Sequence, residues 1–265
     1  MSARPRTDSS TSRRRAWASS ASSRAERQAM VESTMLIFGP EDQSVRTEHE
    51  VMADLLTLAG ASVMAIGPHD VQRLTALAEQ AIHVVAADPD RLRAPDESPA
   101  ANLAFANFGP EHIPQDDSSV DVAVMVDALH RVPAMMLEAG LTELARALRP
   151  GGHLYVSEPV FDGDLNDLTV LVRDDGRERL AAFEALRQAI QAGQYELERE
   201  VFFREPLAFG SFDDFADALL APQPGQVPPR ADVVTRARER FEQFRSGDDS
   251  YVIDARRRVD LLRKV

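Results

Sequence analysis

The sequence predicts an α/β protein with a doubly wound sheet of seven strands, mostly parallel, in which the last strand is antiparallel. Short apolar runs alternate with segments of helical period between residues 62 and 160, which is typical of βα units. Residues 120–126 are almost wholly apolar, as expected for a parallel strand that is buried on both faces. An alternating run at 196–203 and an apolar run at 258–264 then indicate an antiparallel pair at one end of the sheet.

The stretch 62–88 is read as a strand, a tight turn, a helix and a second strand. Its first apolar run ends at Gly67, helical spacing begins at Val71, and the second apolar run, 83–87, stops at Asp88. Folds of this kind bind a ligand against the free N–H groups of the glycine turn and hold a ribose hydroxyl with an acid at the tip of the second strand. An ordinary βαβ unit without a ligand would show the same pattern.

The period of the apolar residues, together with the glycine, proline and capping residues that end helices and strands, predicts the other elements in order. The expected strands are 63–66, 83–87, 102–108, 120–126, 153–157, 196–203 and 258–264. The expected helices are 45–58, 71–81, 133–148, 177–192, 212–220 and 231–245. The helix at 133–148 begins near a proline and ends at Arg149-Pro150-Gly151, a cation followed by a helix stop. We expect the helices between 177 and 245 to form a helical lid over the ligand cleft.

Composition restricts the classes of function. The hydrophobic fraction is 44%, there is no cysteine, and the formal net charge is −13. An acidic chain is poorly suited to phosphate contacts, and no apolar run approaches the roughly 20 residues of a membrane helix. His49-Glu50 starts no zinc motif because position 53 is alanine. We therefore expect a cytoplasmic protein without a metal, acting on a small molecule or on another protein, with no nucleic-acid or membrane partner.

Residues 1–34 differ from the rest of the chain because they are rich in arginine and serine and have no apolar period. This composition predicts a disordered tail. A targeting segment, or a true start at Met30 or Met35, would explain it as well. The expected domain organisation is this tail, a cofactor-binding core at 35–160, and a helical lid with antiparallel strands at 161–265 that complete the same domain.

Three segments resemble the class I S-adenosylmethionine-dependent methyltransferases, in particular the small-molecule type 11 group. They are EHIPQDDSSVDVAV at 111–124, ALHRVP at 128–133, and LARALRPGGHLYVSEP at 144–159. They are similar to that family's loop into its fourth strand, the segment after that strand, and its helix, Pro-Gly-Gly turn and fifth strand. The resemblance implies a Rossmann-like sheet, S-adenosylmethionine as cofactor, and methylation of an oxygen, nitrogen or carbon atom of a small molecule.

The resemblance also implies which residues contact the cofactor. They are Gly67, His69, Asp88, Glu111 and Asp127. The motif is degenerate: the family's acid before the first glycine is Ala65 here, and its later glycines are His69 and Val71. A β-branched residue in a turn that needs close backbone approach weakens binding, whereas a carboxylate at Asp88 supplies a charge-assisted hydrogen bond to a ribose.

Two residues after the predicted fourth and fifth strands are candidates for a catalytic or substrate-binding role. His130 is either a general base for a substrate hydroxyl or a packed histidine with a satisfied hydrogen bond. Glu158 either lines the substrate side or makes a structural hydrogen bond. The alternative to an enzyme is a non-catalytic relative that serves as a partner subunit or binding module. The partners to expect are a small-molecule substrate, another protein, or a second copy of the chain in a homodimer. A nicotinamide oxidoreductase fits the Pro150-Gly-Gly turn and the antiparallel end less well.

Overall fold

The structure is a computed structural model in which residues 43–68, 71–89, 98–220, 227–247 and 250–265 are described. The chain divides into two units, Met1–Met35 and Leu36–Val265, and every described residue belongs to the second. The predicted tail at 1–34 and His69 therefore lie outside the described residues. Within the described ranges, no helix combines the length and apolarity needed to cross a membrane.

The described residues form one mixed sheet of nine strands in the order β1-β7-β9-β6-β5-β2-β3-β4, with β8 paired to β9. The strands are β1 (Ser44–Val45), β2 (Ser62–Ile66), β3 (His83–Ala87), β4 (Leu103–Ala106), β5 (Val120–Val126), β6 (Leu148–Pro159), β7 (Tyr195–Phe209), β8 (Arg245–Gly247) and β9 (Ser250–Lys264). From β4 to β6 all neighbours are parallel, and β9 is antiparallel to both β6 and β7. The predicted fold is confirmed; the short strands β1 and β8 are additional to the seven expected.

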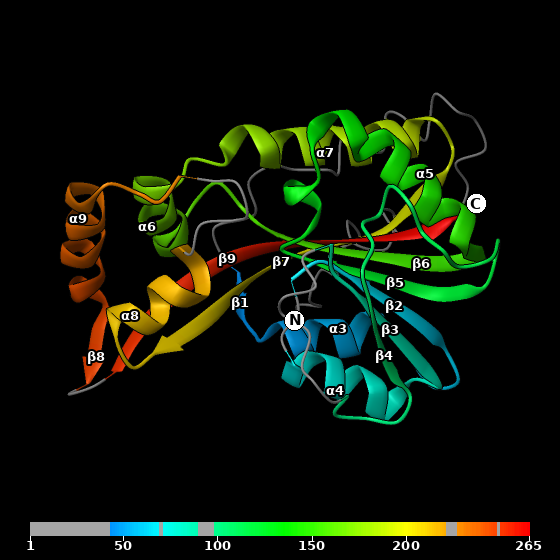
Figure 1. Cartoon of the computed structure of the whole chain (residues 1–265), viewed down its shortest axis with the longest axis horizontal. Helices are drawn as coiled ribbons and strands as arrows, with labels where there is room; N and C mark the ends of the chain where they lie inside the picture. The colour runs from blue at the N-terminus through cyan, green and yellow to red at the C-terminus, as the bar shows by residue number, and fades with distance from the viewer. Residues whose placement is uncertain (1–42, 69–70, 90–97, 221–226, 248–249) are drawn as a thin grey trace, which may run out of the picture. The chain divides into compact units, whose positions relative to one another are not determined.

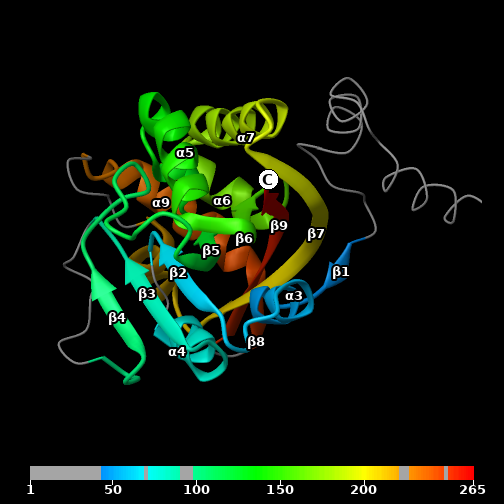
Figure 2. The same cartoon turned by 90° about the vertical axis from the view of Figure 1, so that its right-hand side faces the viewer.

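Helices cover both faces of the sheet (Figures 1 and 2). The first face carries α3 (Glu48–Leu55) and α4 (Val71–Gln80), and the other carries α5 (Leu137–Ala147) and α7 (Gly176–Gln191). One hydrophobic core lies between α3, α4 and the sheet, where residues such as Val51, Leu74 and Val124 are buried. Helix α3 begins with a capping box in which Thr47 and Glu50 satisfy each other's backbone N–H groups. The helix expected at 133–148 starts at Leu137, because the 3₁₀ turn η3 (Ala134–Met136) occupies its first residues; another 3₁₀ turn, η2 (Leu129–Arg131), comes before it.

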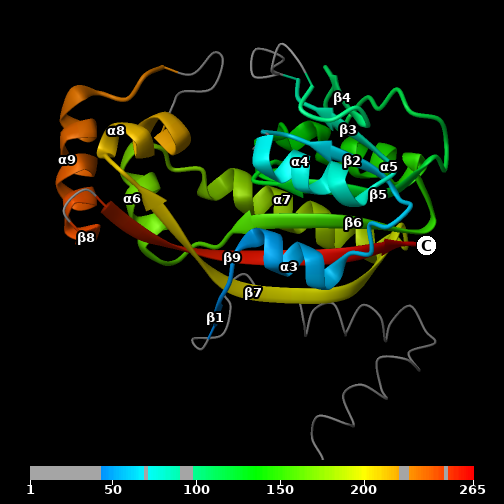
Figure 3. The same cartoon turned by 90° about the horizontal axis from the view of Figure 1, so that it is seen from below.

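Strands β7 and β9 form a long ribbon that extends beyond the parallel part of the sheet (Figure 3). Four helical segments pack on its outer part: α6 (Asp164–Val172), α8 (Phe212–Phe215), η4 (Ala216–Leu220) and α9 (Ala231–Phe241). Together they bury a second hydrophobic cluster, the satellite core, formed by Leu165, Leu168, Phe212, Phe215, Leu220, Ala237, Phe241, Tyr251, Ile253 and Ala255. Because α6 follows β6 directly, the satellite core lies on the side of the sheet where the parallel strands end (Figure 1).

Two details of this region differ from the sequence expectations. Helix α6 was not expected, and α7 packs beside α5 on the face of the sheet rather than with the other C-terminal helices. The lid over the ligand cleft, expected from the helices between 177 and 245, remains a prediction for α7, α8 and α9.

Candidate active site

The carboxyl ends of β2, β3 and β5 lie side by side at one edge of the sheet. Ile66, the last residue of β2, is in register with Ala87, the last residue of β3. Strand β5 pairs with the other side of β2 and ends at Val126. Gly67, Asp88 and Asp127 each follow one of these ends, so they come together at the edge where open α/β sheets bind ligands.

Gly67 has a backbone conformation that favours glycine. Its φ is +115°, and its N–H donates to the carbonyl of Ala87 at 2.9 Å. A Cβ atom placed on Gly67 would lie 2.3 Å from the Cβ of Ala128 in the loop after β5. The glycine is therefore needed both for its dihedral angles and for close packing of this loop against the end of β2.

The other predicted cofactor residues lie at different distances from this edge along the sheet. Asp88 is half-buried, and its N–H donates to the carbonyl of Ala106 at 3.2 Å, which holds it at the tip of β3. Glu111 is exposed in the loop that follows β4, the outermost strand on this side of the sheet, and its carboxylate lies close to Gly109. Val71 is the first residue of α4, and 44% of it is exposed to solvent.

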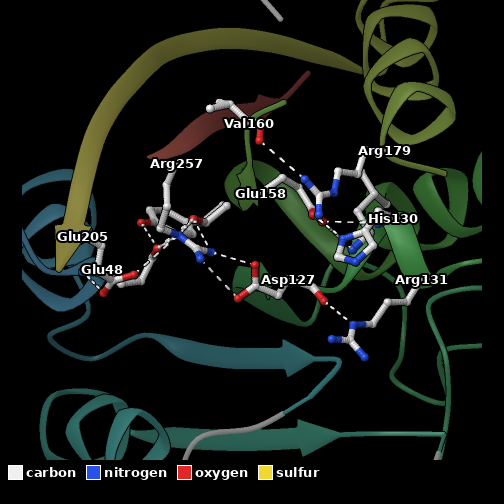
Figure 4. A network of polar contacts seen from close by, with 12 residues as sticks. Glu48, Asp127, His130, Arg131, Glu158, Val160, Arg179, Glu205 and Arg257 are labelled. Carbon is white, nitrogen blue, oxygen red and sulfur yellow. Dashed lines mark hydrogen bonds and ion pairs between the residues drawn. The ribbon is translucent and has the colours of Figure 1, made fainter. Parts of the chain in front are cut away.

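Asp127 connects this edge to a buried arginine (Figure 4). Its φ is +52°, and its N–H donates to the carbonyl of Ser157 at 2.9 Å. Arg257 donates from Nη2 to Oδ1 at 3.0 Å and from Nη1 to Oδ2 at 3.3 Å. Burial alone would raise the pKa of Asp127, but Arg257 outweighs it and holds the pKa below its ordinary value. Asp127 is therefore a carboxylate in the folded protein.

Arg257 is the centre of a polar cluster that we call the arginine network, made of Glu48, Asp127, Tyr155, Ser157, Glu205 and Arg257 (Figure 4). Only 4% of Arg257 is exposed, and its Nε lies 2.8 Å from Oε2 of Glu48. Tyr155 donates to the other oxygen of Glu48 at 2.5 Å, and the Glu48 N–H donates to Glu205 at 2.8 Å. The network joins α3, β6, β7 and β9 to Asp127, the residue that follows β5.

A second polar cluster lies beside the first, and we call it the histidine cluster: His130, Glu158, Asp175 and Arg179 (Figure 4). Oε2 of Glu158 is hydrogen-bonded to Nδ1 of His130, and Oε1 accepts the N–H groups of Leu129 at 2.8 Å and of His130 at 3.2 Å. Nε2 of His130 lies 3.9 Å from Oδ2 of Asp175, which pairs with Arg179 at 2.8 Å. Glu158 thus makes the hydrogen bond that the sequence left open as an alternative.

Comparison with known proteins identifies the central part of the chain. Residues 59–156 match the family described as a methyltransferase domain. Within these residues the chain resembles a methyltransferase domain. A curated relative, the uncharacterized methyltransferase Rv3342 of Mycobacterium tuberculosis, is 40% identical over 106 residues. This alignment covers 38% of the chain and 40% of Rv3342, and the Mycobacterium bovis methyltransferase Mb3374 gives the same values. The chain thus matches less than half the length of these relatives.

Solved structures resemble a larger share of the chain than the family match does. A protein of Bacillus halodurans C-125 that is provisionally named a methyltransferase is 16% identical, with a TM-score of 0.53, over 82% of this chain and 97% of its own. The [4+2]-cyclase SpnF is 19% identical, with a TM-score of 0.51, over 81% of this chain and 78% of its own. At these identities the comparisons show a shared fold only.

Proposed function

We propose that the chain is an S-adenosylmethionine-dependent methyltransferase that acts on a small molecule. The observation that carries this proposal is the meeting of Gly67 and Asp88 at the carboxyl edge of the sheet, inside the methyltransferase domain. Gly67 provides the turn between β2 and α4, and Asp88 stands at the tip of the neighbouring strand. These are the two positions from which βαβ folds hold a nucleoside.

The donor set at this edge fits the cofactor. The Asp88 carboxylate would accept hydrogen bonds from the ribose hydroxyls, and the N-terminus of α4 would face the bound nucleoside. Asp88 places a carboxylate at this edge whose charge complements a sulfonium cation, whereas the charge of Asp127 is offset by Arg257. When bound, S-adenosylmethionine supplies a methyl group from a sulfonium, and positioning supplies most of the rate of such an in-line displacement.

A non-catalytic relative, serving as a partner subunit or binding module, is the second candidate. Ala65, which replaces the acidic residue of the family's motif, is buried and has no carboxylate that could contact a cofactor. The space beside Gly67 is filled by Ala128, and the Asp127 carboxylate is held by Arg257. Each of these features is explained by packing and does not need a cofactor.

Calorimetric titration of S-adenosylmethionine and S-adenosylhomocysteine into the full chain separates the two candidates. We expect micromolar binding that Asp88→Asn weakens about 10- to 150-fold, because a charge-assisted hydrogen bond contributes about 1.5–3 kcal/mol. The matched control is Asp116→Asn, an exposed aspartate before β5 at the opposite end of that strand, which should leave the affinity unchanged. If neither ligand binds at millimolar concentration, the enzyme is rejected and the non-catalytic relative is favoured.

A further inference from the structure

Asp127 has a fixed place beside the glycine turn after β2. The residue next to it, Ala128, is the one that a Cβ atom on Gly67 would meet, so the two loops are packed together. The N–H of Asp127 donates to the carbonyl of Ser157 at 2.9 Å, and its own carbonyl accepts Nε of Arg131 at 2.7 Å. Its φ of +52° is uncommon for a residue other than glycine and persists only where the surrounding structure holds it. The protein therefore sets the direction in which this side chain points.

Arg257 holds the Asp127 carboxylate from the buried side (Figure 4). The two hydrogen bonds, at 3.0 and 3.3 Å, are the parallel pairing in which a guanidinium fixes the plane of a carboxylate. Only 4% of the Arg257 side chain is exposed, whereas 34% of the Asp127 side chain is. Arg257 is in turn held by Glu48 at 2.8 Å. The arginine thus lies behind the carboxylate, and the exposed part of the carboxylate lies at the edge of the sheet.

The hydrogen-bonding capacity of Asp127 is only partly used by Arg257. A carboxylate has about four lone-pair positions, and the guanidinium takes one on each oxygen, so the others can accept from a ligand. Because Arg257 offsets the charge of Asp127, the pair selects a ligand group by hydrogen-bond geometry more than by charge. S-adenosylmethionine has a sulfonium, which has no N–H donor, and an ammonium group, which can donate in several directions. The ammonium group is the one that fits.

We propose that Arg257 is a positioning residue for the cofactor: it orients the Asp127 carboxylate toward the ammonium group of S-adenosylmethionine. This inference rests on the proposed methyltransferase function. Arg257 is too deeply buried to touch the ligand, so it acts through Asp127. Residue 65 on β2 is an alanine where the family's motif has an acid. Asp127, which follows the neighbouring strand β5, supplies a carboxylate that β2 lacks.

Calorimetric titration of the full chain with two ligands tests this assignment. S-adenosylhomocysteine has the ammonium group, whereas 5′-methylthioadenosine has the same nucleoside and thioether but lacks the amino-acid end. Asp127→Asn should weaken binding of S-adenosylhomocysteine about 10- to 150-fold, the effect of one charge-assisted hydrogen bond, and leave 5′-methylthioadenosine unchanged. Arg257→Lys keeps the charge but loses the parallel pairing. It should weaken S-adenosylhomocysteine alone, by about 2- to 10-fold.

The matched control is Arg256→Lys, which makes the same change one position earlier on β9, where the side chain pairs with Asp162. It should leave both affinities unchanged. Equal weakening of both ligands in Arg257→Lys would show that this arginine is purely structural, and would overturn the proposal. If Asp127→Asn weakens S-adenosylmethionine but not S-adenosylhomocysteine, the sulfonium is the partner and the ammonium assignment is wrong.

The native chain alone also decides, even if a variant fails to fold. Native binding of S-adenosylhomocysteine that is no tighter than binding of 5′-methylthioadenosine would overturn the ammonium contact while leaving the proposed function in place. If the native chain binds none of the three ligands at millimolar concentration, the proposed function itself is rejected, and the role of Arg257 in cofactor binding is rejected with it.

Discussion

Arg257→Met removes the cation at the centre of the arginine network and leaves its three carboxylates, on Glu48, Asp127 and Glu205, without their counter-ion. Burial lowers the pKa of Arg257, but these carboxylates raise it above its ordinary value, so the guanidinium is charged in the folded protein. Removing one partner from a buried ion pair typically costs about 3–5 kcal/mol. For a domain of this size that corresponds to a fall in Tm of about 6–20 °C.

Urea unfolding followed by circular dichroism measures this loss in the free energy of unfolding. The matched control is Arg230→Met, because Arg230 is 83% exposed and its pair with Asp232, at 3.0 Å, lies on the surface. We expect the control to lose less than about 1 kcal/mol. The double variant Arg257→Met/Glu48→Gln should recover part of the loss, since one of the unpaired carboxylates is then neutral. Equal losses in Arg257→Met and Arg230→Met would refute the claim that the network is a buried electrostatic unit.

Three more perturbations test other parts of the structure. Gly67→Ala should lower the free energy of unfolding by about 1 kcal/mol or more beyond the loss in Gly60→Ala. Both glycines have positive φ, but only a Cβ on Gly67 would meet a neighbour, Ala128. Equal losses of the two variants in thermal unfolding would contradict this. Phe241→Ala should lower the free energy of unfolding by about 3–5 kcal/mol. Amide hydrogen exchange should then lose more protection in α9 than in β5, and an equal loss of protection across the chain would show that the satellite core is not a separate unit. Burial raises the pKa of Glu205 above its ordinary value of 4.5, against the opposing effect of Arg257, so the contribution of Glu205 to native stability falls as pH rises above that value. The unfolding free energy of Glu205→Gln relative to the native chain should therefore increase from pH 4.5 toward pH 8, and a constant difference would disprove the shift.

The parallel part of the sheet could be predicted from the sequence because its signals are local. Each strand there is a short apolar run closed by glycine, proline or aspartate, and the helices between the strands keep a period of 3.6 residues. Gly67 and Asp88 were found in this way, from one strand-turn-helix-strand stretch, and the structure places both at the same edge. His130 was named as a candidate from its place after β5.

The arginine network could not be predicted, because its members are distant in sequence. Arg257 stands in a run of three arginines that suggests an exposed strand. It is nevertheless buried, and its ion-pair partners lie on α3, in the loop after β5 and on β7. The one available signal was the presence of charged residues within β9, where Asp260 is also buried. Helix α6 was missed for a similar reason: it is only nine residues long, and the partners of Leu165 and Leu168 in the satellite core come from distant segments.

The position of β9 in the sheet has a consequence for how the chain folds. β9 is the last strand in chain order, but it lies between β6 and β7 and makes antiparallel hydrogen bonds with both. Until residues 250–264 are in place, β6 is an unprotected edge of an apolar sheet, and such edges pair readily with other chains. The pairing of β9 with β6 spans about a hundred residues of intervening chain, so it forms slowly compared with local contacts. We therefore expect the folding intermediate that lacks β9, rather than the native protein, to be the species most prone to aggregation.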